Sequence, residues 1–104
     1  MGIASLLEGW QEKIGVRVDD WTVRKMRTKW GSCNPQTKRI NINLELVKKP
    51  PECLEYILVH ELVHLLERHH NERFISLMDG YLPNWRLHRD LLKSLPLGHD
   101  EWKY

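Results

Sequence analysis

A chain of 104 residues with 41% apolar side chains is long enough for one domain with its own core. Residues 1–104 are therefore expected to form a single domain, with residues 97–104 as a candidate tail. The net charge of only +2 does not by itself indicate a nucleic-acid-binding or membrane protein. Two cysteines are too few for a disulfide scaffold, and the sequence has neither a signal-peptide pattern nor a stretch long enough to span a bilayer. The expectation is a cytoplasmic protein with reduced thiols and no membrane partner.

The first half of the chain predicts one helix followed by strands. Apolar residues recur at helical spacing over residues 3–14, and Gly15 supplies a stop signal. Residues 16–30 alternate loosely, which predicts one or two strands broken near Asp19-Asp20. Residues 31–37 have the composition of a turn or loop. Residues 39–46 alternate cleanly, which predicts a half-buried strand that is antiparallel to the preceding one if the loop makes a hairpin.

The second half predicts three helices. Pro50-Pro51 begins a long apolar helical pattern that runs from about residue 51 to residue 68. Asn71 is the expected N-cap of a second helix, which should end at Asp79-Gly80. A third helix is expected to begin near Pro83 or Asn84 and to end before Pro96 and Gly98.

The chemistry of the sequence is concentrated in the first of these three helices, at His60-Glu61-Leu62-Val63-His64. Residues four apart on a helix lie about 40° apart on one face, so two imidazoles at this spacing can bind one zinc ion. The glutamate next to the first histidine can act as general base on a water bound to the metal, whose pKa zinc lowers to about 7. Glu61 is thus the candidate base, with His60 and His64 as candidate zinc ligands. The alternative, without a function, is two surface histidines beside a surface glutamate on a solvated helix.

A catalytic zinc ion usually has three protein ligands, so a third must come from elsewhere. On an uninterrupted helix His70 would lie about 15 Å beyond His60, too far to share the metal. His70 can therefore contribute only if the helix ends after about Arg68 and the chain turns back. It is the first choice, and the alternatives are His69, Glu72 and His88.

Four segments together resemble the YgjP-like group of metallopeptidases, which is related to SprT-like and minimal gluzincin-type zincins. They are R-K-M-R-T-K-W-G-S-C from Arg24 to Cys33, then I-N-I-N-L, then L-E-Y-I-L-V-H-E-L-V-H-L, and a histidine ten residues after the first motif histidine. The resemblance covers about residues 10–92. It implies zinc ligation by His60, His64 and His70, with Glu61 as base. The expected fold class is α+β, a small zincin-like domain with a short antiparallel sheet packed on the active-site helix and with flanking helices.

The leading hypothesis is a zinc-dependent metallopeptidase that hydrolyses a peptide or protein substrate. The charge is uneven, because residues 1–50 carry a net +5 and residues 51–104 a net −3. A basic front half also fits a metal-dependent hydrolase of nucleotides or phosphate compounds, or a non-catalytic module that binds nucleic acid or acidic proteins through residues 24–39. The sequence names neither the substrate nor the oligomeric state.

Three further expectations concern the surroundings of the motif. Gly31 allows a close backbone approach, while Cys33 is a candidate fourth, inhibitory zinc ligand or a residue that only shapes a turn. Tyr81, Arg86 and His88 are candidates for stabilising an oxyanion. An exposed strand edge, from residues 22–30 or 38–45, could bind an extended peptide by strand addition.

Overall fold

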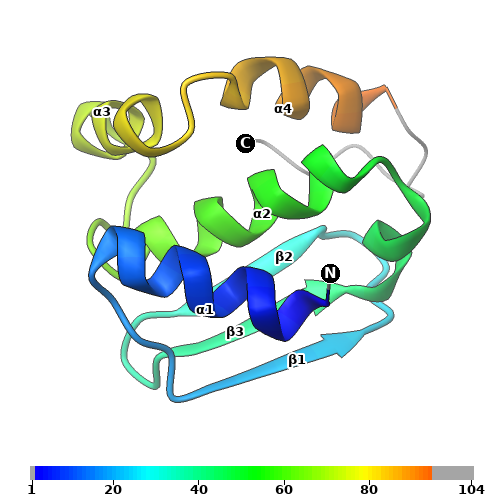
Figure 1. The fold of residues 1–104 in the computed structure, drawn as a ribbon, viewed down its shortest axis with the longest axis horizontal. Helices are drawn as coiled ribbons and strands as arrows, with labels where there is room; N and C mark the ends of the chain where they lie inside the picture. The colour runs from blue at the N-terminus through cyan, green and yellow to red at the C-terminus, as the bar shows by residue number, and fades with distance from the viewer. Residues whose placement is uncertain (1, 95–104) are drawn as a thin grey trace.

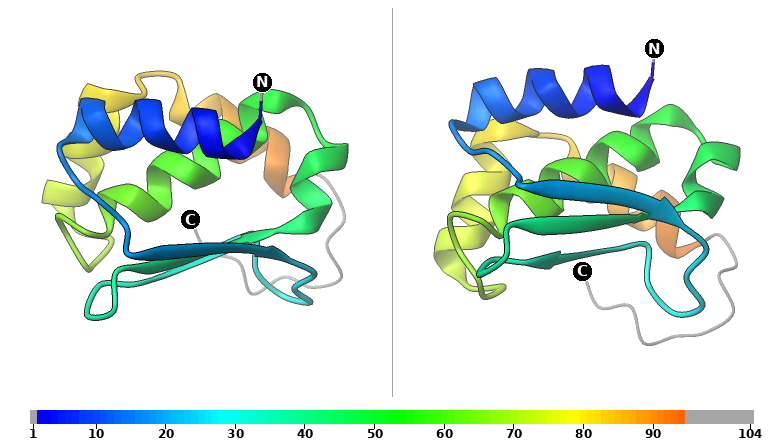
Figure 2. Two further views of the ribbon diagram at one scale, coloured as in Figure 1. Left: turned by 60° about the horizontal axis from the view of Figure 1, so that its bottom comes forward. Right: turned by 90° about the horizontal axis from the view of Figure 1, so that it is seen from below.

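The computed structural model describes residues 2–94, so the candidate tail at residues 97–104 lies outside the described residues. A three-stranded sheet forms one layer, and four α-helices cover one of its faces (Figures 1 and 2). This is the predicted α+β class. The elements are α1 (Ile3–Ile14), β1 (Asp20–Arg24), β2 (Gly31–Asn34), β3 (Arg39–Asn43), a 3-10 helix η1 (Leu44–Lys48), α2 (Pro51–Val63), α3 (Glu72–Tyr81) and α4 (Trp85–Lys93).

Helix α1 has the predicted bounds because glycine ends it. Gly15 has a φ of 79°, a left-handed conformation that glycine adopts without strain, and its N–H donates to the carbonyl of Gln11. The apolar face of α1 packs into the core, and the Trp10 indole N–H donates to Glu55 of α2 over 2.9 Å. Helix α1 is thereby tied to the central helix.

The sheet is mixed, whereas the sequence predicted an antiparallel one. Strand β3 lies in the middle, antiparallel to β2 and parallel to β1. The predicted hairpin is present, but its first strand is residues 31–34, which were predicted to be loop. Asn34 closes the hairpin by accepting hydrogen bonds from the backbone N–H groups of Gln36 and Thr37, so the turn needs only the residues after Asn34.

Strand β3 ends at Asn43, three residues earlier than predicted. Ile40 and Ile42 point into the core, as the alternation predicted. The fully buried Asn43 side chain donates to the carbonyls of Met26 and Lys29, while its oxygen accepts from the N–H of Glu45 and caps η1. This one side chain therefore ends the strand and anchors the connection between β1 and β2.

Helix α2 lies between the sheet and the other helices, so every residue from 56 to 63 is buried. It ends at Val63 rather than near residue 68. Helix α3 begins after Asn71, whose side-chain oxygen accepts from the Phe74 N–H over 3.0 Å, as predicted for an N-cap, and it continues past Asp79-Gly80 to Tyr81. Within residues 2–94 no helix combines the length and the apolar character needed to cross a membrane.

Candidate metal centre

The predicted motif lies in the interior of the protein. His60 and Glu61 are each 1% exposed and His64 is 8% exposed. His64 follows the last residue of α2 but keeps helical dihedral angles. The four-residue spacing therefore brings the centroid of its ring to 4.7 Å from the centroid of the His60 ring. Burial at this level excludes two surface histidines on a solvated helix.

A turn after α2 brings a third histidine to this pair. The Nε2 atom of His70 lies 3.0 Å from the Nε2 atom of His64, and its ring centroid lies 5.1 Å from that of His60. The ligand atoms of the three side chains all lie within 4.8 Å of one another. The predicted break in the helix exists, although it comes at Val63 rather than after Arg68.

The other candidates for a third ligand are not brought to this point. Among residues 2–94, the group of metal-ligand side chains that assembles here contains His70 but not His69, Glu72 or His88. His69 is exposed, Glu72 opens α3, and His88 lies on α4.

The orientation of His64 is fixed by the turn itself. Its Nδ1 atom lies 3.1 Å from the backbone carbonyl of Glu67. An imidazole whose Nδ1–H donates to a carbonyl has its lone pair on Nε2. The backbone thus selects the tautomer of His64 whose Nε2 lone pair faces His70 and is available to a metal ion.

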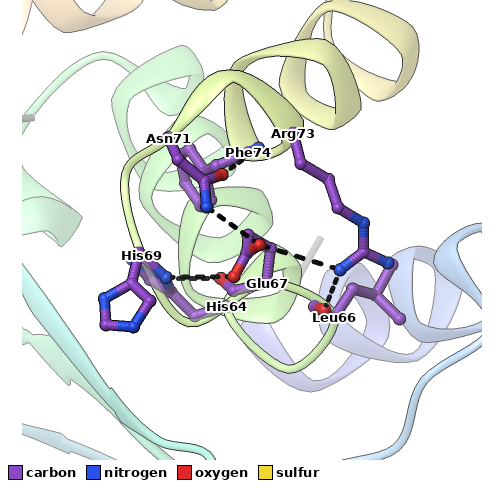
Figure 3. A network of polar contacts seen from close by, with 7 residues as sticks. All are labelled: His64, Leu66, Glu67, His69, Asn71, Arg73 and Phe74. Atoms are coloured by element: carbon purple, nitrogen blue, oxygen red, sulfur yellow. Dashed lines mark hydrogen bonds and ion pairs between the residues drawn. The ribbon is translucent and has the colours of Figure 1, made fainter.

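The Glu67 carboxylate holds the turn in shape, and sequence reasoning did not single it out (Figure 3). It accepts from the Asn71 side-chain amide over 3.0 Å and from the His69 backbone N–H over 3.3 Å. The hydrogen bond from Asn71 is the main reason that the pKa of Glu67 is lowered. Arg73 donates to the carbonyl of Leu66 over 2.7 Å and lies 3.9 Å from the carboxylate. These contacts span the residues on both sides of His70.

Phe74 is a second residue whose role the sequence did not reveal. Its ring centroid lies 4.9 Å from that of His60, 4.7 Å from that of His64 and 5.0 Å from that of His70. One buried aromatic ring therefore supports all three imidazoles. The available signal was its place four residues after His70, in the first turn of a capped helix.

Burial sets the protonation of the site. It lowers the pKa of His60 to about 3 and that of His64 to about 4, so both imidazoles are neutral at pH 7, as metal binding requires. It raises the pKa of Glu61 to about 7, against the opposing effect of His64, His70 and Lys29. A carboxyl group with this pKa can both accept and donate a proton near neutral pH.

Strand β2 packs against α2 beside Glu61, at the glycine expected to allow a close approach. A Cβ atom at Gly31 would lie 2.7 Å from Cγ2 of Ile57 and 3.1 Å from Oε2 of Glu61. The absence of a side chain at this position lets the strand backbone lie directly against Ile57 and Glu61 of α2.

A cleft of about 430 Å³ opens between β2 and the turn after α2. Its lining is polar and comes from Lys29, Ser32, Cys33, Asn34, Pro35, Gln36, Glu61, His64, Arg68 and His70. Of the two predicted peptide-binding edges, residues 38–45 include the central strand β3, and residues 22–30 include the end of the edge strand β1. The strand that borders the cleft is the other edge strand, β2.

The candidate fourth zinc ligand lines this cleft, whereas the three candidates for stabilising an oxyanion do not. The Cys33 side chain lines the cleft, but burial first and Glu61 second raise its pKa to about 12, so the thiol stays protonated at neutral pH. Tyr81, Arg86 and His88 are not among the residues that line the cleft in the described part of the chain. Arg86 instead pairs with Asp79 over 2.6 Å.

The donor set fits a divalent transition metal. Three imidazole ligands without a thiolate or carboxylate are typical of sites for zinc and the neighbouring first-row transition metals. Two nitrogens at about 2.05 Å from a tetrahedral zinc ion lie about 3.3 Å apart, close to the 3.0 Å between the Nε2 atoms of His64 and His70.

Comparisons with known proteins identify the family and the fold. The family model described as "YgjP-like, metallopeptidase domain" matches residues 2–95. The fold is similar to the metallopeptidase zymogen abylysin of Pyrococcus abyssi, with a TM-score of 0.80 and 19% identity over 89% of this chain and 93% of that chain. It is also similar to the metallopeptidase zymogen jannalysin of Methanocaldococcus jannaschii, with a TM-score of 0.75 and 20% identity over 91% of this chain and 99% of that chain. A comparison with curated proteins yields no match. Because the family model spans nearly the whole of its sequence, the chain belongs to the YgjP-like metallopeptidase domain family.

Proposed function

We propose that the protein is a zinc-dependent peptidase in which His60, His64 and His70 hold the metal and Glu61 is the general base. The observation that carries the proposal is the convergence of three neutral imidazoles beside a buried carboxyl group, at the wall of an open cleft. Family membership supports peptide bonds as the target.

Zinc, when bound, supplies Lewis acidity, which lowers the pKa of water and polarises a substrate carbonyl. Glu61 accepts the proton that the attacking water gives up, and then donates it to the departing amine nitrogen. Burial raises the pKa of Glu61 and so makes the carboxyl group a stronger base than an exposed glutamate, while the charge of a bound zinc ion would act in the opposite direction. The contact of His64 with the Glu67 carbonyl keeps its Nε2 directed at the metal throughout.

The substrate peptide is proposed to bind along β2. Strand β2 is an edge of the sheet and contributes Ser32, Cys33 and Asn34 to the cleft. An extended peptide can add to such an edge through backbone hydrogen bonds, which do not depend on sequence. A peptide bound there would present its scissile carbonyl to the metal that the three histidines would hold.

The test is substitution of Glu61 by glutamine. The variant should bind zinc at one ion per chain, as the wild type does, but hydrolyse fluorogenic peptides about 10²- to 10⁴-fold more slowly, because it lacks the base. Glu52→Gln, an exposed position on the same helix, is the matched control and should leave the rate unchanged. Wild-type protein that fails to bind zinc, or a Glu61→Gln variant with full activity, would refute the proposal.

A further inference from the structure

The cleft beside the histidines is positively charged. Lys29 and Arg68 are the two cations that line it, and the one acidic residue in its lining is Glu61, which is 1% exposed. Lys29 comes from the connection that leads into β2, and Arg68 comes from the turn after α2. A substrate in the cleft therefore meets basic side chains on two walls.

Neither cation forms an ion pair in the described part of the chain, although Lys29 is close enough to Glu61 to oppose the rise in its pKa. Among the ion pairs formed within residues 2–94, none involves Lys29 or Arg68, whereas Arg17, Arg39 and Arg86 each pair with a carboxylate. The sheet side of the cleft also offers no counter-charge in sequence, since residues 21–44 contain six Lys/Arg and no Asp/Glu. Both side chains are exposed and so are accessible to a ligand.

The backbone that carries each cation is anchored. The Lys29 carbonyl accepts from the buried Asn43 side chain over 2.7 Å, and the next residue, Trp30, is 2% exposed. Arg68 lies between Glu67 and His69, which are joined by the hydrogen bond from the His69 N–H to the Glu67 carboxylate. A charge on fixed backbone loses less freedom when it pairs with a ligand, so it discriminates better.

The surface on the other side of His70 has no basic lining residue within the described part of the chain. A second hollow, of about 620 Å³, shares only His70 with the cleft. Its lining includes Glu72 and Asp79, the second of which pairs with Arg86, and among residues 2–94 it contains no Lys or Arg that could attract an acidic side chain. Selection for negative charge should therefore apply on one side of the scissile bond and not on the other.

We propose that Lys29 and Arg68 form an anion-selective subsite. The preferred substrates are then peptides that carry Asp or Glu next to the scissile bond, on the side of that bond that lies in the cleft and not in the second hollow. This proposal rests on the proposed peptidase function and adds the substrate class. The pairing is between exposed charges across a partly open cleft, so each cation should contribute about a fivefold preference in kcat/KM, and the preference should weaken with salt.

The experiment compares zinc-loaded protein on matched peptides that carry Glu, Ala or Lys at each position around one scissile bond. The expected result is a higher kcat/KM for Glu than for Lys on one side only, with a ratio that falls in Lys29→Gln and in Arg68→Gln. Lys25→Gln is the matched control, because Lys25 lies in the same connection but does not line the cleft. Equal rates for the three peptides, or a preference for Lys on both sides, would overturn the proposal.

A binding measurement separates this proposal from the proposed function. A labelled Glu-containing peptide should bind the Glu61→Gln protein more tightly than its Lys counterpart, and Lys29→Gln should reduce the difference about fivefold whether or not the wild type cleaves peptides. If nucleoside triphosphates displace the acidic peptide and are hydrolysed in its place, the subsite serves phosphate groups and the proposal is wrong.

Discussion

Substitution of Gly31 by alanine tests whether strand β2 lies as close to the catalytic helix as described. The new Cβ atom would lie 2.7 Å from Cγ2 of Ile57, whereas carbon atoms in contact are ordinarily about 3.5–4.0 Å apart. Ile57 is fully buried, and its Cγ2 is attached to a branched Cβ with few allowed rotamers, so it cannot easily turn away. Relief of this overlap should cost about 1–3 kcal/mol of folding free energy.

The expected loss corresponds to a Tm lower by roughly 5–20 °C for a domain of this size, measurable by calorimetry. The same Cβ atom would lie 3.1 Å from Oε2 of Glu61, so the base should also be displaced. A shift of about 1 Å in a catalytic group can lower the rate by about 10²-fold, so kcat/KM should fall more than the remaining folded fraction explains.

Two variants make the test specific. Gly9→Ala lies in the middle of α1 with no atom within 4 Å of the new Cβ, so it should raise stability by about 0.5–1 kcal/mol and leave kcat/KM unchanged. Ile57→Ala removes the methyl group that the new Cβ meets. In the double variant Gly31→Ala/Ile57→Ala the loss should be smaller than the sum of the single losses by at least about 1 kcal/mol. A Gly31→Ala protein that melts within 1 °C of the wild type would refute the close approach.

Two other predictions concern residues around the site. Glu67→Gln replaces an acceptor of two hydrogen bonds with an amide that clashes with one of the two donors, so zinc affinity should fall about tenfold in competition with a chromophoric chelator, while Glu52→Gln keeps wild-type affinity. Equal affinities would show that the turn holds its shape without the carboxylate. Burial raises the pKa of Cys33 to about 12, so its thiol should react with iodoacetamide at pH 8 far more slowly in the folded protein than in urea. A folded-state rate close to that in urea would contradict this protonation.

The helices were predictable because their apolar spacing is strong, and the bounds of α1 followed from one glycine. Strand β2 was not predictable, because residues 31–34 have no apolar alternation and read as a turn. They form a strand only because β3 offers them an edge and because Gly31 can lie against Ile57. Both causes are tertiary, and local sequence does not record them.

The sequence placed the C-terminal end of α2 about five residues too late, for a related reason. Leu65 and Leu66 continue the helical pattern beyond Val63, but they lie in a turn and pack against the core from there, partly buried. The turn is set by the carboxylate of Glu67, whose partners lie two and four residues later. Spacing alone could say that His70 needs a turn to reach His60, but the hydrogen bonds decide where that turn begins.

The burial of the motif is the strongest reason to expect a function there. His60 and Glu61 lie in the most completely buried stretch of the protein, where residues 56–63 are all shielded from water. Burial opposes the charged form of each group, and an apolar pair would avoid that penalty. The histidine and the glutamate therefore lower the stability of the core. Phe74 nevertheless packs against this imidazole, and the turn brings His70 back to it. Such exceptions to good packing are expected at functional sites, and here the exception coincides with three histidines that are placed so that they could hold one metal ion.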